Sequence, residues 1–156
     1  MKFYYVDSSY VSYLRKIDSK VLDNSDFYFQ RPYVGIIVNI DGIKFLVPLS
    51  SPRSRFTKNK PQYHKVMDGT NLIAVLKFNN MIPVLDSLIQ EIIFNNVTDQ
   101  NYKNLLLKEY QFISTNETVI KNKATNYLNR IWNSNSFYHG ISNDFQALIE
   151  AMNNYT

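Results

Sequence analysis

Cysteine is absent from this chain of 156 residues, and only two histidines occur, His64 and His139. Without cysteine the protein cannot form disulfides, bind a metal through thiolates or use a cysteine nucleophile. Two histidines are also too few for an ordinary zinc site. We therefore expect a functional site with no metal and no cofactor.

Long hydrophobic runs and an N-terminal signal peptide are missing as well. No stretch approaches the ~20 apolar residues that cross a bilayer, and Asp7 interrupts the short apolar start of the chain. Only 19% of the residues are charged and 45% are hydrophobic, a composition typical of a folded chain with a real core. We expect one domain over residues 1–156, located in the cytoplasm and without a membrane partner.

Acidic residues are missing from residues 42–67, and the whole chain has a formal net charge of +4. A segment that carries only positive charge attracts polyanions such as RNA. A solvated loop that happens to contain lysines has the same composition, so charge alone leaves both interpretations open. We predict RNA contacts in this window at Arg55, Lys58, Lys60, His64 and Lys65.

Asp41-Gly42 separates two apolar runs, residues 33–40 and 43–49. This dipeptide between such runs predicts a β-hairpin, because the tight turn needs positive φ angles. The second strand ends in Ser50 and Ser51, and Arg53 follows after a proline. Hydroxyl and guanidinium groups both donate hydrogen bonds to phosphate oxygens, so this strand end predicts a phosphate site.

The remaining pattern predicts a small, strongly bent antiparallel sheet with helices mostly in the C-terminal half, an α+β fold. Pro48 should lie at a sheet edge or a bulge, because it cannot donate a hydrogen bond to a neighbouring strand. The expected strands cover residues 1–6, 33–40, 43–49, 71–78 and 85–94, with a long loop over 50–68. The apolar residues of 85–94 also fit helical spacing, so a helix is the alternative there. The expected helices cover residues 9–17, 98–115 and 118–132, with a last helix after Ser142.

Aromatic residues make up 15% of the chain, and two tyrosines are candidates for contact with RNA bases. Tyr28 lies in an aromatic run just before Arg31, and aromatic rings beside an arginine suit single-stranded RNA, because bases stack on rings. Tyr10 lies early in its helix and could face a groove. Packing in the protein core explains both tyrosines equally well.

Short motifs in a fixed order along the chain resemble the ToxN/AbiQ family, endoribonuclease toxins of type III toxin–antitoxin systems. The most specific are the box Pro48-Leu49-Ser50-Ser51-Pro52-Arg53 and the box Asn80-Met81-Ile82-Pro83-Val84. Further matches are Met1-Lys2-Phe3-Tyr4, Ser8-Ser9-Tyr10, Tyr13-Leu14, Val34-Gly35-Ile36, Lys44-Phe45-Leu46, Leu76-Lys77-Phe78, Tyr102-Lys103, Leu105-Leu106 and Gln111-Phe112-Ile113. Together these matches cover nearly the whole chain.

The resemblance implies a compact SH3-type antiparallel β-barrel with added helices, like that of the MazF and Kid toxins. It implies sequence-specific, metal-independent cleavage of cellular or phage RNA that leaves a 2′,3′-cyclic phosphate and a 5′-hydroxyl. It also implies inhibition by a small RNA antitoxin, whose repeat units assemble with the toxin into a closed complex. Such systems abort phage infection.

The resemblance places catalytic roles on Ser50, Ser51, Arg53 and Arg31. The family often has lysine where this chain has Arg53. Arginine keeps the positive charge but does not exchange a proton, so position 53 is expected to bind phosphate rather than to transfer protons. The tyrosine of the family falls near Phe27 or Tyr28.

The sequence offers no evident general base for the 2′-hydroxyl. His64 has the right ordinary pKa range, and a solvent-facing loop histidine is the alternative interpretation. A protein of a different class, a non-catalytic RNA-binding module with the same basic groove, is also compatible with these residues. Loss of RNA cleavage on replacing Ser51 would distinguish the enzyme from the binding module.

Overall fold

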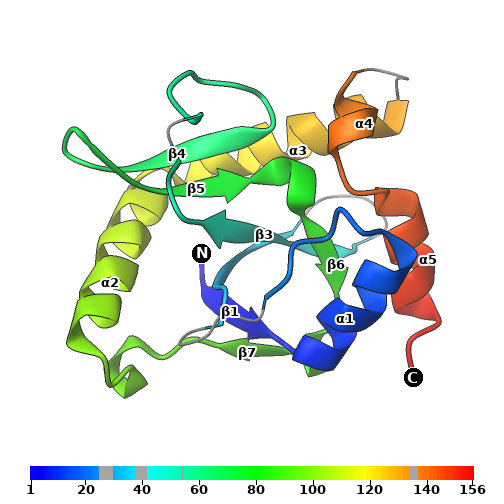
Figure 1. The fold of residues 1–156 in the computed structure, drawn as a ribbon, viewed down its shortest axis with the longest axis horizontal. Coiled ribbons are helices and arrows are strands. Elements are labelled where there is room, and N and C mark those ends of the chain that lie inside the picture. Colours follow the sequence, from blue (N-terminus) through cyan, green and yellow to red (C-terminus); the bar gives the residue numbers. More distant parts are fainter. Residues whose placement is uncertain (25–29, 38–41, 54, 134–136) are drawn as a thin grey trace.

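The computed structural model describes residues 1–24, 30–37, 42–53, 55–133 and 137–156, which form an antiparallel sheet with helices on two sides (Figure 1). The strands are β1 (Phe3–Val6), β2 (Tyr33–Ile37), β3 (Lys44–Ser50), β4 (Tyr63–Asp68), β5 (Asn71–Lys77), β6 (Ile82–Val84) and β7 (Ile89–Glu91). The helices are α1 (Ser8–Ile17), α2 (Gln100–Thr115), α3 (Glu117–Asn133), α4 (Tyr138–Ile141) and α5 (Phe145–Asn153). The predicted α+β class is confirmed.

Strand β3 is the centre of the sheet. It pairs with β2 on one side, and on the other side with β6 at residues 44–46 and β5 at residues 49–50. Its side chains supply two separate clusters of buried residues. Phe45, Val47 and Leu49 pack with residues of α2 and α3, whereas Leu46 packs with residues of α1 and α5. Because both faces are covered, the strand is apolar almost throughout.

The predicted hairpin is confirmed in its strands. β2 and β3 pair antiparallel from Tyr33 opposite Pro48 to Ile37 opposite Lys44. Gly42 has a φ of 71°, the positive value that the turn requires. Asp41, its partner in the turn motif, lies outside the described residues.

Pro48 was expected at a sheet edge or a bulge, but it lies in β3, which is an inner strand of the sheet. On the side of β5 and β6, the described pairing stops at Leu46 and resumes at Leu49. Pro48 therefore lies where β3 changes partners, and a residue without an N–H group is tolerated there.

The expected barrel is not closed. The strands follow the order β4-β5-β3-β2-β1-β7, and no pairing in the described part of the chain joins the outer strands β4 and β7. Helix α2 runs along this open side (Figure 1). It contacts β4, and its Tyr110 ring lies 5.4 Å from that of Phe94, just after β7. A helix thus occupies the position where closure of the sheet would occur.

Two further expectations are corrected. Residues 50–68 are not one long loop, because their last part forms β4, paired with β5 from Tyr63 to Asp68. Residues 85–94 are not one strand. Only Ile89–Glu91 pairs with β1, and short 3-10 turns lie on both sides.

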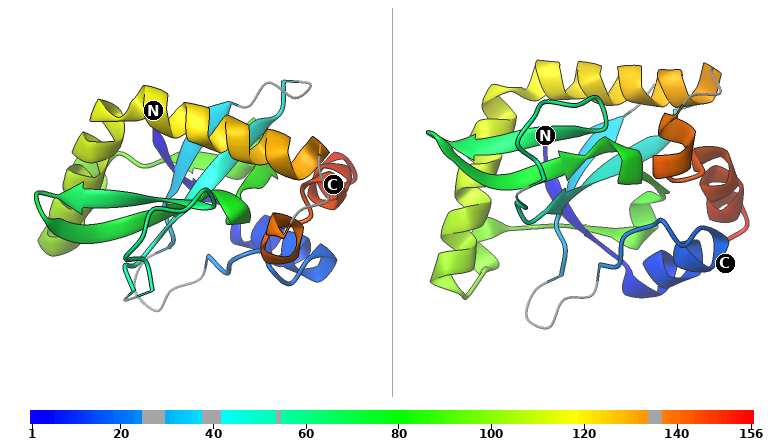
Figure 2. Two further views of the ribbon diagram at one scale, coloured as in Figure 1. Left: turned by 90° about the horizontal axis from the view of Figure 1, so that it is seen from above. Right: turned by 45° about the horizontal axis from the view of Figure 1, so that its top comes forward.

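Helices α1 and α2 begin near their predicted positions, whereas the last helix is capped by Asp144 and not by the predicted Ser142. Asp7, Asp99 and Asp144 each accept a hydrogen bond from the backbone N–H three residues ahead, which satisfies an otherwise unpaired donor. Helices α2 and α3 meet in an L on one side of the sheet, and α1 lies against α5 on the other (Figure 2). No helix in the described ranges combines the length and apolar character of a membrane-spanning segment.

Candidate active site

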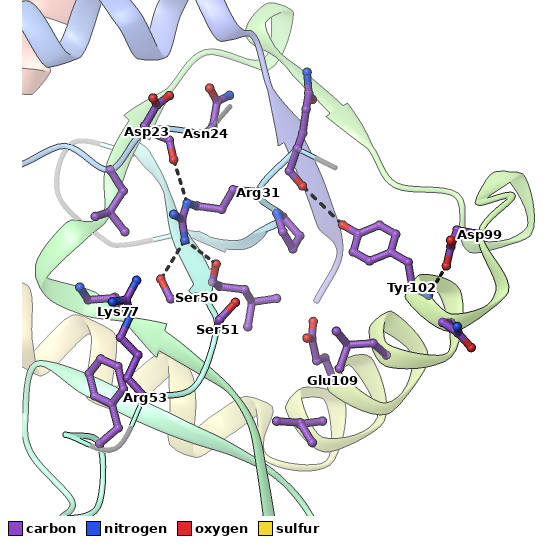
Figure 3. Close-up of a pocket in the computed structure, with 18 of the residues that line it drawn as sticks. Asp23, Asn24, Arg31, Ser50, Ser51, Arg53, Lys77, Asp99, Tyr102 and Glu109 are labelled. Carbon is purple, nitrogen blue, oxygen red and sulfur yellow. Dashed lines mark hydrogen bonds between the residues drawn. The ribbon is translucent and has the colours of Figure 1, made fainter. Parts of the chain in front are cut away.

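A cleft of about 670 Å³ lies between the end of β3, the end of β5, the residues before β2 and helix α2 (Figure 3). Its two sides differ in chemistry. One side carries hydroxyl and cationic groups, at Arg31, Ser50, Ser51, Arg53, Arg55 and Lys77. The α2 side carries Asp99, Tyr102 and Glu109 beside the apolar Leu105. The predicted catalytic residues therefore share one cleft.

Arg31 connects the segment before β2 to the end of β3. Its Nη1 donates to the Leu49 carbonyl at 2.9 Å and to Ser50 Oγ at 2.8 Å, and its Nε donates to the Asp23 carbonyl at 3.1 Å. The Pro32 carbonyl also accepts a hydrogen bond from the Leu49 N–H. These contacts hold the guanidinium beside the serine pair, where a phosphate can meet both kinds of donor.

The end of strand β3 determines where Ser50 and Ser51 lie in the cleft. Ser50 is the last residue of β3 and pairs with Val75 of β5, whereas Ser51 is exposed just beyond the ladder. Arg53 and Arg55 come next, and the Arg55 guanidinium lies 5.0 Å from the centre of the Phe56 ring. Phe56 is buried against Tyr63, so this basic turn is anchored at its far end.

Lys77, at the end of β5, is a cleft residue that the sequence predictions missed. Burial and the positive charges of Arg55, Arg31 and Arg53 lower the pKa of Lys77 from 10.5 to about 8. About a tenth of this amine is therefore uncharged at pH 7, and about half at pH 8. The strand alternation predicts Lys77 only as an outward-facing polar residue. The sequence feature that could have pointed to a role in the site is its place within the family match Leu76-Lys77-Phe78.

Glu109, on α2, is a second residue that the predictions missed. Its side chain is buried, its Oε2 has no hydrogen-bond partner among the described residues, and burial raises its pKa from 4.5 to about 8. The carboxyl is thus mostly protonated near neutral pH. The helical spacing could have indicated this burial, because Glu109 lies between Leu106 and Ile113 on the buried face of the helix.

The α2 side of the cleft is tied to the Arg31 segment through Tyr102. The Tyr102 hydroxyl donates to the Gln30 carbonyl at 3.4 Å, and the Tyr102 N–H donates to the cap residue Asp99 at 2.8 Å. The start of α2 therefore fixes both a ring and a carboxylate at the cleft (Figure 3).

Tyr10 requires a correction among the predicted RNA contacts. Its exposed fraction is 0%, and its hydroxyl donates to the Pro83 carbonyl at 2.6 Å. The ring packs against Tyr13 and Tyr155. A ring without exposed surface cannot stack on a base, so Tyr10 belongs to the core. Tyr28, the other predicted tyrosine, lies outside the described residues.

His64 also differs from its prediction. It lies in β4 rather than in a loop, half-buried, with its ring 6.0 Å from that of Phe112 and its Nδ1 3.1 Å from Lys123 Nζ. Burial and the Lys123 charge lower the pKa of His64 to about 4. It is therefore uncharged near neutral pH and is not part of the cleft lining.

The lysines of the basic segment lie outside the cleft. Lys58 and Lys60 are exposed, and Lys65 Nζ donates to the Thr57 carbonyl at 3.3 Å. Of the five contacts predicted in this segment, only Arg55 lines the cleft. The lysines remain predicted contacts for RNA that extends beyond it.

Fold and cleft together define a class: an α+β protein with an open antiparallel sheet and a cationic cleft suited to a phosphodiester. A sequence model of the family described as "Toxin ToxN, type III toxin-antitoxin system" matches residues 2–153. Endoribonuclease ToxN from Bacillus thuringiensis subsp. kurstaki is 33% identical over 162 residues, covering 99% of this chain and 84% of that relative. The chain therefore belongs to the ToxN family of type III toxins, as the resemblance predicted.

Two solved structures share the fold over nearly their whole length. One, from work on selective toxin inhibition by a non-coding RNA pseudoknot, has a TM-score of 0.86 at 34% identity and covers 99% of this chain and 96% of its own. The other, from work on a processed non-coding RNA that regulates a bacterial antiviral system, has a TM-score of 0.85 at 26% identity and covers 99% of each chain.

Proposed function

We propose that this chain is a sequence-specific endoribonuclease toxin that an RNA antitoxin inhibits. The observation that carries the proposal is the meeting of Arg31, Ser50, Ser51 and Arg53 in one cleft of a ToxN-family chain. The relative from Bacillus thuringiensis supports the proposal, because it is named an endoribonuclease.

The reaction we propose is attack of the RNA 2′-hydroxyl on its own phosphorus, which yields a 2′,3′-cyclic phosphate and a 5′-hydroxyl. Positive charge placed at the phosphoryl oxygens supplies the largest effect in such reactions. Arg31 and Arg53 carry this charge, and the exposed Ser51 hydroxyl orients the phosphate. Ser50 Oγ accepts a hydrogen bond from Arg31 and so helps to hold that guanidinium in place.

For the partners, we propose that repeat units of a small RNA antitoxin bind the same basic surface and assemble with the toxin into a closed complex. The two solved relatives, one studied with an inhibitory RNA pseudoknot and one from an antiviral system, support this role. Free toxin would act in the cytoplasm, where cellular and phage RNA are accessible. The sheet is not closed into the expected barrel, and the remaining likeness to the MazF and Kid toxins stays a prediction.

Replacing Ser51 by alanine tests the proposal against a non-catalytic RNA-binding module. We expect RNA cleavage to fall by at least about 10²-fold, and growth arrest on expression to disappear. RNA affinity should change by no more than about fivefold, because one exposed hydroxyl contributes little to binding. Cleavage is followed on gels, and affinity by fluorescence anisotropy.

Ser87→Ala is the matched control, since Ser87 is exposed and outside the cleft lining. This variant should cleave at the wild-type rate. Absence of cleavage and of growth arrest in the unmodified chain, with RNA affinity intact, would favour the binding module instead.

We also propose that cleavage needs no metal ion. In the described ranges no three histidine, aspartate or glutamate side chains come together as ligands. Cleavage should therefore continue at an unchanged rate after dialysis against EDTA, measured on the same RNA at constant ionic strength. A loss of activity that Mg²⁺ or Mn²⁺ restores would contradict this proposal.

A further inference from the structure

The proposed reaction needs a group that accepts the 2′-hydroxyl proton, and few groups of the cleft are able to do so. Arg31, Arg53 and Arg55 remain charged at any relevant pH. Among the described lining residues there is no histidine, and Glu109 is buried on the α2 side of the cleft, away from Arg31, Ser50 and Arg53 (Figure 3). Asp23 is ion-paired with Arg15 at 3.0 Å, and Asp99 caps α2.

Lys77 is the one lysine of the described cleft lining, and its position fits this task. It ends β5, the strand that pairs with the end of β3 through Leu49 opposite Leu76 and Ser50 opposite Val75. Its side chain reaches the end of the cleft that holds Arg31, Ser50 and Arg53 (Figure 3). Its Nζ makes no hydrogen bond or ion pair with another described residue.

We propose that Lys77 Nζ, in its uncharged form, accepts the proton of the attacking 2′-hydroxyl. This inference rests on the proposed endoribonuclease function and assigns the base that the sequence left unidentified. Surface lysines are almost fully charged near neutral pH and cannot accept a proton. Here burial and three neighbouring guanidinium groups favour the neutral amine, and lysines tuned in this way act as bases.

The step is balanced in atoms and electrons. The 2′-O–H proton moves to Lys77 Nζ, and the electron pair of that bond forms the new 2′-O–P bond. The P–O5′ bond breaks, and its electron pair stays on the leaving 5′-oxygen, which takes a proton from water. The ammonium formed on Lys77 adds positive charge beside the phosphoryl oxygens and later returns its proton to solvent.

The pH dependence of kcat/KM tests the proposal, because it reports the pKa of the free enzyme's base. The substrate is a short RNA that contains the sequence cut by the unmodified chain, found by sequencing fragment ends. We expect kcat/KM to rise with pH and to level off above about pH 8. Lys77→Arg keeps the charge but removes the base, so it should cleave about 10²–10⁴-fold more slowly and lose this limb of the profile.

Lys123→Arg is the matched control. Lys123 is also partly buried with a lowered pKa, but it does not line the cleft. It should keep the wild-type rate and profile. Circular dichroism and RNA affinity establish that each variant is folded, and Lys77→Gln provides a second replacement, without the charge, with the same expected loss.

Each result distinguishes the base from the broader function. A Lys77→Arg enzyme with the wild-type rate, or a slower enzyme that keeps the same limb, would overturn the role of Lys77 and leave the endoribonuclease intact. A wild-type profile without this limb would do the same. An unmodified chain that cleaves no RNA at any pH would overturn the proposed function together with this inference.

Discussion

Replacing Arg31 by glutamine is expected to lower RNA cleavage by about 10²–10³-fold and the free energy of unfolding by about 1–3 kcal/mol. Cleavage falls because a guanidinium at the phosphate site is lost. Stability falls because the Leu49 carbonyl, the Asp23 carbonyl and Ser50 Oγ all lose their donor. Cleavage kinetics and urea unfolding measure the two effects separately.

Arg53→Gln is the comparison that separates these roles. Arg53 is exposed, so its replacement should lower cleavage to a similar degree and leave unfolding within about 0.5 kcal/mol of the wild type. If Arg31→Gln lost stability but cleaved normally, Arg31 would be a structural residue of the strand end. If Arg53→Gln cleaved normally, the second charge would come from elsewhere in the cleft.

Replacing Glu109 by glutamine is expected to change how stability depends on pH. Below about pH 4.5 this carboxyl is protonated in the folded and the unfolded chain alike. Between about pH 4.5 and 8 the unfolded chain loses the proton while the folded chain keeps it, so the free energy of unfolding falls as pH rises. Near pH 8 the difference amounts to about 3–5 kcal/mol.

Glu109→Gln cannot ionise, so it should be more stable than the wild type near pH 8 and similar to it near pH 4.5. Urea unfolding across this range measures the difference. Glu117→Gln is the control of opposite sign, because hydrogen bonds from Lys121 and the chain N-terminus lower the pKa of Glu117. Equal pH dependence in wild type and Glu109→Gln would show that the buried carboxyl is already ionised below pH 8.

The sequence predicted part of the site correctly and misplaced two residues. The predicted site residues Arg31, Ser50, Ser51 and Arg53 do meet in one cleft, since a strand end and the residues before its partner strand are adjacent in any such hairpin. Tyr10 was misplaced because a helical position does not reveal which neighbours cover a side chain. His64 was misplaced because strand β4 was not predicted, and the sequence does not reveal that Phe112 and Lys123 lie against it.

The hairpin, the helices other than α4, the family and the hydroxyl and guanidinium groups at the end of β3 could all be predicted from the sequence, because they depend on local turn chemistry, periodicity and ordered motifs. Two features could be seen only in the folded chain: α2 takes the place of barrel closure, and the pKa values of Lys77 and Glu109 are shifted to about 8. Protonation follows burial and the charges of residues far along the chain, and folding alone brings these together.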